Sequence, residues 1–234
     1  MNTMTAESSK QAAGQAAASL VEDGMVLGLG TGSTVSHFLL AVARRISSEG
    51  LKVTGVPTSE ATAAEARNLG IQISTLEDNP ILDLVVDGAD EVDSEFRLIK
   101  GGGGALLREK IVASAGKKVV IIVGTNKTVE RLGTTFLLPV EVMPFGHSAT
   151  KEKISALGCR PFLRTADEAG SPMVTDNGNY IFDCKFDDGI VDPEGLHRSL
   201  SELPGVAEVG LFLNLCDVLI EGRDDGSAKV SERP

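Results

Sequence analysis

The feature that most constrains the fold is a regular alternation of short apolar runs with longer amphipathic stretches in the first half of the chain. Four apolar runs have the length of strands, at residues 25–29, 52–56, 83–87 and 118–123. Four stretches with helical periodicity accompany them, at about residues 9–22, 34–48, 59–69 and 105–115. Such alternation is typical of a parallel sheet joined by crossover helices. This half therefore predicts an α/β fold, with a Rossmann-like, mainly parallel sheet and helices on both faces.

The pattern changes after Gly133, where "FLLPVEVMP" precedes a helix near residues 148–157 and an extended "CRPFLR". In "PMVTDNGNYIFDCKF", the sequence Asp176-Asn177-Gly178 predicts a turn that joins two strands as a hairpin. A helix near residues 193–203 and a strand "VAEVGLF" follow. We expect a smaller inserted α+β domain of ferredoxin-like type, while "DVLIEG" predicts a strand that rejoins the first sheet. The expected division is a Rossmann-like domain at residues 1–131 and 210–234, and the inserted domain at residues 132–209.

Charge and hydropathy exclude several classes of partner. The chain has 234 residues and a formal net charge of −11, and such a surface repels phosphate backbones. We therefore expect no nucleic acid and no membrane as a partner. No apolar stretch reaches the roughly 20 residues of a membrane span, and "MNTMTAESSKQAAG" has no signal-like region, so we expect a cytoplasmic protein. The three cysteines are far apart and have no neighbouring histidine, which predicts core residues rather than disulfides or a zinc site.

The first segment that can carry chemistry is "GLGTGSTV", residues 28–35, directly after an apolar run. A dinucleotide fingerprint requires glycine where Ser33 stands, and an acidic residue after the second strand, where "KVTGVPTS" has none. A nucleotide P-loop would also need a lysine after the loop. Two interpretations remain. Outward-facing N–H groups and hydroxyls of this turn bind a small phosphate at a helix N-terminus, or Ser33 or Thr34 merely caps the helix.

The second segment, "DLVVDGADEVD", ends a buried strand at the point where open α/β sheets bind ligands. It places four acidic residues close together, namely Asp87, Asp90, Glu91 and Asp93. Such crowding raises the pKa of some carboxyl groups. The segment fits acid/base chemistry or recognition of substrate hydroxyls, a magnesium site, or a solvated loop.

The third segment, "KGGGGALLREK", places Lys100 before four glycines and a helix. A glycine run indicates a close approach of the backbone to a ligand, with N–H groups that hold an oxyanion, or else a flexible hinge. On the helix, the neighbours of Glu109 three and four positions away are all apolar. This face predicts a partly desolvated carboxylate with the raised pKa that suits a general base. The alternative is an ordinary surface residue.

In this order, "GLGTGSTV", "DGADEVD" and "KGGGGALLREK" resemble the ribose-5-phosphate isomerases of type A. The resemblance continues through "LPVEV", "VTDNGN" and "LPGVAEVGLF", so it covers nearly the whole chain, although "PFGHSA" around residues 145–147 departs from it. It implies an aldose–ketose isomerase that interconverts ribose 5-phosphate and ribulose 5-phosphate through an enediolate, in the non-oxidative pentose phosphate pathway. It also implies a small sugar phosphate as partner, a homo-oligomer (dimer or tetramer), and no metal or organic cofactor.

The resemblance further implies roles for single residues. Glu109 corresponds to the base that moves the proton between C2 and C1, and Asp87 and Asp90 to groups for ring opening and the sugar hydroxyls. Lys100 and the amides of the glycine run correspond to the groups that stabilise the enediolate oxygens. The implied substrate-binding residues are Lys10, Thr31, Gly32, Ser33, Thr34, Asp87, Gly88, Ala89, Asp90, Lys100, Gly101, Gly102, Gly103 and Lys127. Of these, residues 31–34 match the phosphate loop of the family.

Two other functions fit a related fold. A sugar-phosphate sensor, such as the effector domain of a repressor, would need a DNA-binding module. The first predicted helix starts too early, and the chain is too acidic, to leave room for one. An amino-sugar-phosphate isomerase or deaminase would instead turn over glucosamine 6-phosphate. We expect the pentose phosphate isomerase.

Overall fold

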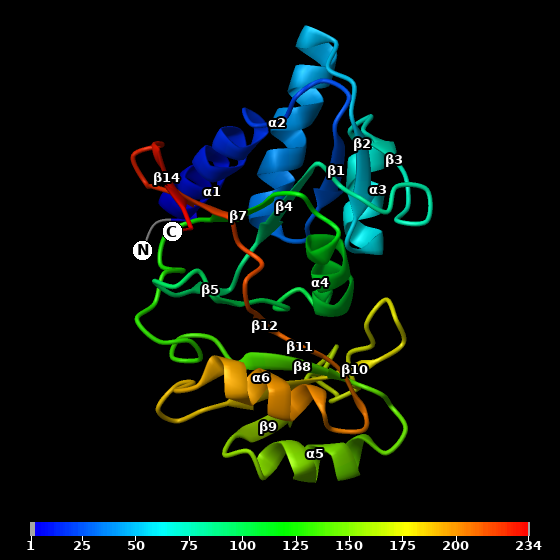
Figure 1. Ribbon diagram of the computed structural model, residues 1–234, viewed down its shortest axis with the longest axis vertical. Coiled ribbons are helices and arrows are strands. Elements are labelled where there is room, and N and C mark those ends of the chain that lie inside the picture. Colours follow the sequence, from blue (N-terminus) through cyan, green and yellow to red (C-terminus); the bar gives the residue numbers. More distant parts are fainter. Residues whose placement is uncertain (1–2, 234) are drawn as a thin grey trace. The chain divides into compact units, whose positions relative to one another are not determined.

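The structure is a computed structural model that describes residues 3–233, and these fall into two compact units. The first unit comprises Met1–Ala89, Arg108–Lys127 and Asn214–Pro234, and the second comprises Asp90–Leu107 and Thr128–Leu213. Figure 1 shows the elements of both units, coloured along the chain. The first unit is thus built from three separate pieces of the sequence.

The core of the first unit is a seven-stranded sheet in the order β14-β13-β7-β4-β1-β2-β3. Its strands are β1 (Val26–Leu29), β2 (Thr54–Pro57), β3 (Gln72–Ile73), β4 (Leu84–Gly88), β7 (Val119–Val123), β13 (Val218–Gly222) and β14 (Ala228–Glu232). All neighbours pair in parallel except β14, which is antiparallel to β13. The predicted α/β fold with a mainly parallel sheet is confirmed, and so is the return of "DVLIEG" to this sheet.

Helices cover both faces of the sheet. α1 (Thr3–Ala18) and α2 (Ser33–Glu49) pack on one face, where Phe38 shares a buried cluster with Leu27 of β1. Because side chains alternate along a strand, Gly28 faces the other side. A Cβ on Gly28 would lie 2.7 Å from Val112 of α4 (Leu106–Ser114), which covers that face. α3 (Glu60–Asn68) packs beside β2 and β3.

α1 also lies against β13 without side chains between them. A Cβ on Gly222 of β13 would lie 1.8 Å from the carbonyl oxygen of Ser9, so the two backbones touch. Only glycine leaves room for this approach. An element from the start of the sequence therefore packs directly on one that follows the whole second unit.

The first helix begins and ends earlier than the predicted residues 9–22. Its C-terminus is held by Arg45 of α2, whose Nη1 donates to the carbonyl oxygens of Ala18 and Val21, at 2.7 Å each. Carbonyl groups at the end of a helix have no intrahelical partner, so this guanidinium satisfies them where the helix stops. Local periodicity could not show this, because the arginine comes from a different helix.

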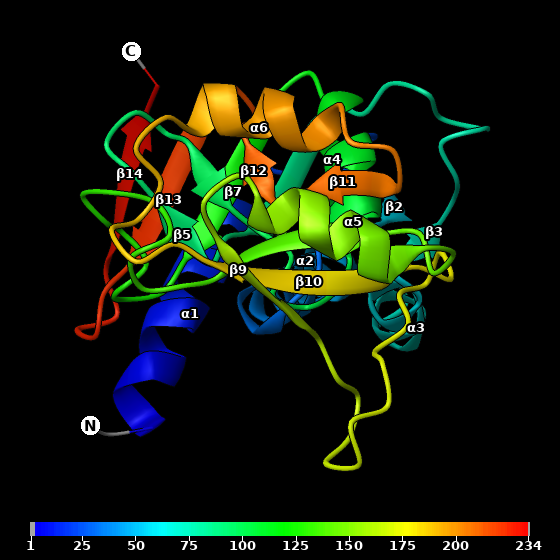
Figure 2. The same ribbon diagram turned by 90° about the horizontal axis from the view of Figure 1, so that it is seen from below.

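The second unit contains a four-stranded antiparallel sheet in the order β11-β8-β10-β9. Its elements in chain order are β8 (Leu138–Val142), α5 (His147–Ser155), β9 (Arg160–Leu163), β10 (Tyr180–Lys185), α6 (Pro193–Ser201) and β11 (Val206–Val209). The order βαββαβ with this strand arrangement is the ferredoxin-like topology that the sequence predicted. Figure 2 shows the connection from β9 to β10 as a long excursion, drawn in yellow.

The hairpin predicted around Asp176-Asn177-Gly178 is wrong, although its turn forms. The N–H of Gly178 donates to the carbonyl of Thr175, and the N–H of Thr175 to the carbonyl of Asn179. β10 is paired with β8 on one side and with β9 on the other, so both of its edges are occupied. The apolar run before the turn therefore lies outside the sheet. A turn preference is local, whereas strand pairing depends on the whole sheet.

The predicted strand "VAEVGLF" is divided at Gly210. β11 precedes this glycine, and β12 (Leu211–Phe212) joins β5 (Glu91–Val92) and β6 (Leu98–Ile99) in a three-stranded sheet of order β12-β6-β5. A Cβ on Gly210 would lie 2.5 Å from the carbonyl oxygen of Lys100. This three-stranded sheet was not predicted. Because β5 and β6 belong to it, residues 90–107 are part of the second unit. The domain limits expected from the sequence, at residues 132–209, stay a prediction.

Candidate active site

The predicted phosphate loop and Asp87 lie at the carboxyl ends of two neighbouring strands, β1 and β4. From β1 the chain continues to β2 and β3 on one side of the sheet, and then to β4, β7 and β13 on the other. Open α/β sheets bind their ligands at the carboxyl ends of the strands where the order reverses in this way. Two hydrogen bonds join the strand ends at this position: from the N–H of Gly30 to the carbonyl of Val86 (2.9 Å), and from the N–H of Thr31 to Oδ1 of Asp87 (3.1 Å).

The backbone holds the Asp87 side chain in one orientation. Asp87 is 1% exposed, and its Oδ1 also accepts a bond of 2.7 Å from the N–H of Gly88. A Cβ on Gly30 would lie 2.1 Å from Oδ1, so no other residue fits at position 30 without displacing the aspartate. Gly30 after β1 thus leaves the space that the Asp87 carboxylate of the neighbouring β4 occupies.

The predicted phosphate loop leads into α2, which begins at Ser33. The N-cap is Gly32, with a φ of 124° and no side-chain cap hydrogen bond, so the alternative that Ser33 or Thr34 caps the helix is wrong. Gly32 and Ser33 are exposed, and Thr34 is half-buried. N–H groups in the first turn of a helix have no intrahelical acceptor, and they lie at the positive end of its dipole. This helix end is therefore suited to bind an anion.

Thr31 departs from the prediction, because its hydroxyl faces the protein. Oγ1 of Thr31 lies 2.7 Å from that of Thr58, 2.9 Å from Oγ of Ser59 and 3.1 Å from Oγ1 of Thr62. The Thr62 hydroxyl also donates to the carbonyl of Gly30 at 2.9 Å. This hydroxyl cluster holds the turn between β1 and α2. It was missed from the sequence, although "SEAT" marks Ser59 as the N-cap of α3, which the structure shows it to be.

Glu109 is buried in the first turn of α4, with 4% of its surface exposed. The expected desolvation is confirmed, and the alternative of a surface residue is wrong. Lys10 on α1 lies beside Gly124, which directly follows β7: a Cβ on Gly124 would be 3.3 Å from Cγ of Lys10. Lys127 is half-buried in the same loop. Both lysines thus lie at the carboxyl ends of the strands, the end of the sheet at which Asp87 also lies.

In the second unit, Asp90 and the glycine run contact each other. Oδ2 of Asp90 accepts a 2.8 Å hydrogen bond from the N–H of Gly102, and a Cβ on Gly102 would lie 2.6 Å from Oδ1. Lys100 is 2% exposed, and its Nζ lies 5.4 Å from the centre of the Phe212 ring, as in a cation–π contact. Gly101 has a φ of 105°, which favours glycine.

Hydrogen bonds also hold the glycine run from its other side. Nη1 of Arg164 donates to the carbonyl oxygens of Gly101 (2.9 Å) and Gly102 (3.2 Å), and the N–H of Gly104 closes a turn onto Gly101. A hinge would lack such bonds, so this alternative is not supported. Arg164 was missed from the sequence, where no local signal marks it.

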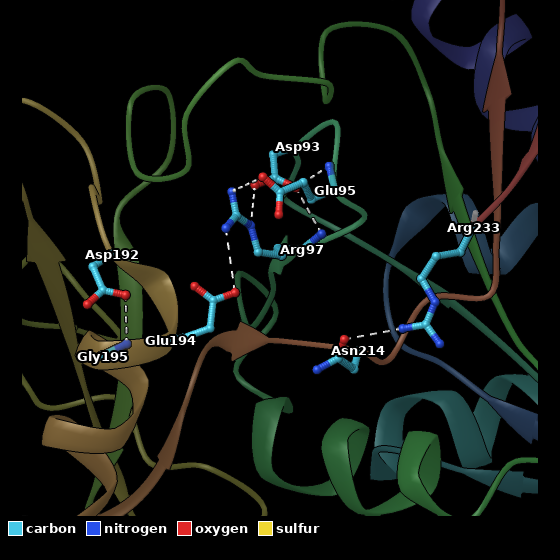
Figure 3. Close-up of polar contacts among 8 residues, drawn as sticks. All are labelled: Asp93, Glu95, Arg97, Asp192, Glu194, Gly195, Asn214 and Arg233. Carbon is cyan, nitrogen blue, oxygen red and sulfur yellow. Dashed lines mark hydrogen bonds and ion pairs between the residues drawn. The ribbon is translucent and has the colours of Figure 1, made fainter.

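The other two acidic residues of "DGADEVD" serve the fold. Glu91 is fully buried and accepts bonds of 2.5 to 2.7 Å from three backbone N–H groups within residues 133–136. Asp93 accepts a 2.7 Å bond from Nε of Arg97, and Figure 3 shows this guanidinium between Asp93 and Glu194. Both carboxylates therefore already bind donors of the protein, unlike residues of a solvated loop or of a vacant magnesium site.

Comparison with known proteins places the whole chain in one group. Residues 54–226 match the family model of Ribose 5-phosphate isomerase A (phosphoriboisomerase A). The chain is 49% identical to ribose-5-phosphate isomerase A of Parvibaculum lavamentivorans, over 96% of this chain and 98% of the relative. It is 50% identical to that of Methanoregula boonei, over 88% of this chain and 85% of the relative.

Solved structures agree with the sequence relatives. Ribose 5-phosphate isomerase A from Methanocaldococcus jannaschii is similar with a TM-score of 0.90 and 37% identity, over 95% of this chain and 97% of that chain. A D-ribose-5-phosphate isomerase in complex with phospho-erythronic acid is similar with a TM-score of 0.94 and 36% identity, over 100% of both chains.

Proposed function

The chain belongs to the ribose 5-phosphate isomerase A family, and from this membership we propose how its residues carry out the reaction. It is an aldose–ketose isomerase of pentose phosphate metabolism, which interconverts ribose 5-phosphate and ribulose 5-phosphate. The reaction moves a proton between C2 and C1. It therefore needs a base, groups that stabilise the developing oxyanion, and an anchor for the rest of the sugar.

The observation that carries the proposal is the burial of one carboxylate, Glu109, shortly after the glycine run. Burial removes most of the water around a carboxylate that is 4% exposed, so the group can act on a bound substrate in a largely dry environment. We assign Glu109 as the base that removes the proton from C2 and returns it to C1, with an enediolate between the two steps.

The phosphate group is assigned to the N-terminus of α2. The N–H groups of Gly32, Ser33 and Thr34 and the two hydroxyls of this turn are the donors, and Lys10 adds a positive charge. Thr31 contributes by holding the turn, because its own N–H and hydroxyl are bound within the protein. A similar solved structure holds phospho-erythronic acid, which combines a phosphate with a carboxylate. That ligand supports a site for one phosphate and a second, smaller anion.

The remaining residues are assigned to the sugar and the oxyanion. Asp87 and Asp90 act on ring opening and on the hydroxyl groups, since each is held firmly by backbone N–H groups. Lys100 and the amides of the glycine run, Gly101–Gly103, stabilise the enediolate oxygens. Gly88, Ala89 and Lys127 complete the proposed substrate-binding set.

Three further properties belong to the proposal. We expect no metal and no organic cofactor, because side chains and amides supply both the proton transfer and the charge stabilisation; activity that survives chelation tests this. We expect a cytoplasmic homo-oligomer, dimer or tetramer, which light scattering after gel filtration tests. Within residues 3–233, no helix is both long and apolar enough to cross a membrane.

The experiment that tests the function follows ribose 5-phosphate and the purified protein in heavy water. Ribulose 5-phosphate that carries deuterium at C1 is the expected product, because the base exchanges its proton with solvent. Glucosamine 6-phosphate, offered in parallel, should not be consumed. Absence of ketose would overturn the function, and ketose without any deuterium would overturn proton transfer in favour of a hydride shift.

A further inference from the structure

We propose that Arg164 is a positioning residue of the isomerase: it orients and polarises the peptide groups of the glycine run, and so presents the N–H of Gly103 to the enediolate oxygen. The proposal rests on the function proposed above. It assigns a role to a residue that lies outside the three motifs and outside the implied substrate-binding set.

Arg164 directly follows β9 and is itself firmly held. Its side chain is 13% exposed, and Nε and Nη2 donate to the two carboxylate oxygens of Asp183 on β10, at 2.9 and 2.5 Å. This two-point contact fixes the plane of the guanidinium group. The third nitrogen, Nη1, is left to reach the carbonyl oxygens of Gly101 and Gly102.

The bonds to these carbonyls determine where the next N–H groups point. In a trans peptide group, the C=O and the N–H point to opposite sides. The bond to the carbonyl of Gly101 therefore directs the N–H of Gly102 away from Arg164, and that N–H donates to Oδ2 of Asp90 at 2.8 Å. The guanidinium and the carboxylate thus hold one peptide group from its two sides.

The next peptide group, between Gly102 and Gly103, is held by Arg164 on its carbonyl side and, within the described part of the chain, by no carboxylate on its N–H side. Arg164 binds the carbonyl of Gly102 at 3.2 Å, so the N–H of Gly103 also points away from the guanidinium. Gly103 is exposed, and among residues 3–233 no acceptor bonds to its N–H. A cation at the carbonyl oxygen polarises the peptide and makes its N–H a stronger donor. This N–H is therefore oriented, strengthened and available to a developing negative charge.

The β9–β10 connection supports the run at its far end as well. A Cβ on Gly104 would lie 2.5 Å from Cε of Met173, so Met173 packs directly on this glycine. The N–H of Met173 in turn donates to the carbonyl of Arg164 at 2.9 Å. Arg164 and Met173 thus form one support that contacts the run at both ends.

The competing explanation is that Arg164 merely joins β9 to β10. The chain offers a matched control for it, because Arg160, the first residue of β9, pairs with Asp187 just after β10. Both of these side chains are exposed, at 60% and 70%, and the pair has the same chemistry. Arg160→Gln therefore removes an arginine–aspartate pair from the same sheet without touching a carbonyl of the glycine run.

The experiment compares wild type, Arg164→Gln, Arg164→Lys and Arg160→Gln as full-length proteins. For each, kcat and KM for ribose 5-phosphate and the melting temperature are measured. The inhibition constant of phospho-erythronic acid, the ligand of the similar solved structure, is measured as well. Complete loss of an oxyanion donor costs about 10²–10³-fold in kcat. In Arg164→Gln the N–H of Gly103 is misaligned but still present, so it keeps part of its stabilising effect. We therefore expect kcat to fall about 10- to 100-fold. KM should change little, because the phosphate anchor is intact. The inhibition constant should rise, because the inhibitor carboxylate carries its charge where the enediolate does.

Arg164→Lys keeps the charge but cannot bind Asp183 and both carbonyls together, so it should fall between wild type and Arg164→Gln. Arg160→Gln should match wild type in all kinetic values. An unchanged kcat in Arg164→Gln, or a lower kcat with an unchanged inhibition constant, would overturn the positioning role. If Arg164→Gln fails to fold, Asp183→Asn tests the same support, with a smaller loss of kcat and weaker inhibition expected. Failure of the proposed function is distinguishable, since wild type and Arg160→Gln would then be inactive too.

Discussion

The N–H of Thr31 donates a hydrogen bond of 3.1 Å to Oδ1 of Asp87, and this bond joins the ends of β1 and β4 where the strand order reverses. The orientation of the carboxylate therefore depends on the backbone of the proposed phosphate loop. Asp90 repeats the arrangement with the N–H of Gly102. In both places a glycine is required by the carboxylate that it faces, since a Cβ would lie 2.1 Å from the first and 2.6 Å from the second.

Gly30→Ala tests the fit between the two strand ends. The new Cβ would lie 2.1 Å from Oδ1 of Asp87 and 2.6 Å from its Cα, so the aspartate backbone itself must shift. Overpacking of this kind costs about 1–3 kcal/mol of stability, and a misplaced catalytic group costs about 10²-fold in rate. We expect both losses, measured by urea unfolding and by kcat/KM. A variant with wild-type stability and activity would contradict the fit.

Thr34→Glu tests the phosphate site. A carboxylate in the first turn of α2 repels the substrate phosphate, so KM for ribose 5-phosphate should rise at least about tenfold, while kcat at saturation changes less. Ser48→Glu is the matched control, because it adds the same charge to the exposed other end of the same helix. It should leave KM unchanged. Equal KM values in the two variants would place the phosphate elsewhere.

Glu109→Gln tests the proposed base. Glutamine keeps the size of the side chain but cannot accept the proton, so kcat should fall about 10²–10⁴-fold while the affinity for the sugar phosphate survives. The control is Glu60→Gln. Glu60 is an exposed carboxylate of α3 that pairs with Arg108, the neighbour of Glu109 on α4. Steady-state kinetics and deuterium entry report on the two variants. Near-normal exchange in Glu109→Gln would remove this residue from the mechanism and leave Asp87 as the next candidate.

Cys216 gives a prediction about reactivity at different pH. Burial raises the pKa of this thiol to about 12, and the neighbouring Asp217 carboxylate adds to the effect. A raised pKa keeps the thiol protonated, so at pH 8 roughly one molecule in ten thousand carries the reactive thiolate. Iodoacetamide at pH 8 should leave Cys216 of the native protein unmodified and alkylate it in urea, as peptide mass spectrometry can show. Rapid alkylation of the native protein would contradict this pKa.

The sequence predicted those structural features of the candidate site that depend on local patterns. Asp87 follows a run of buried strand residues, and Glu109 lies on an apolar helical face, so the position of the first and the burial of the second could be predicted from their neighbours. The hydroxyl of Thr31 was misplaced because its partners, Thr58, Ser59 and Thr62, lie after another strand.

The support of the glycine run could not be predicted for the same reason. Arg164 is separated from Gly101 by 63 residues, and only the pairing of β9 with β10 brings its guanidinium into place. The length of the first helix likewise depends on Arg45, 27 residues beyond Ala18. Contacts between distant parts of the chain leave no periodic trace in either partner, whereas the strands and helices themselves do.

The place of β13 between β7 and β14 imposes an order on folding during synthesis. Residues 128–213 leave the ribosome as one continuous stretch, while α1 and β7 must wait for residues 218–222 before their packing is complete. Until then β7, with the sequence "VVIIV", can pair only with β4, and its other edge stays unpaired. Such an edge is a template for pairing with another chain. A nascent chain that stalls before residue 218 therefore exposes a segment that is prone to aggregate. This exposure ends only when β13 has been synthesised and pairs with β7.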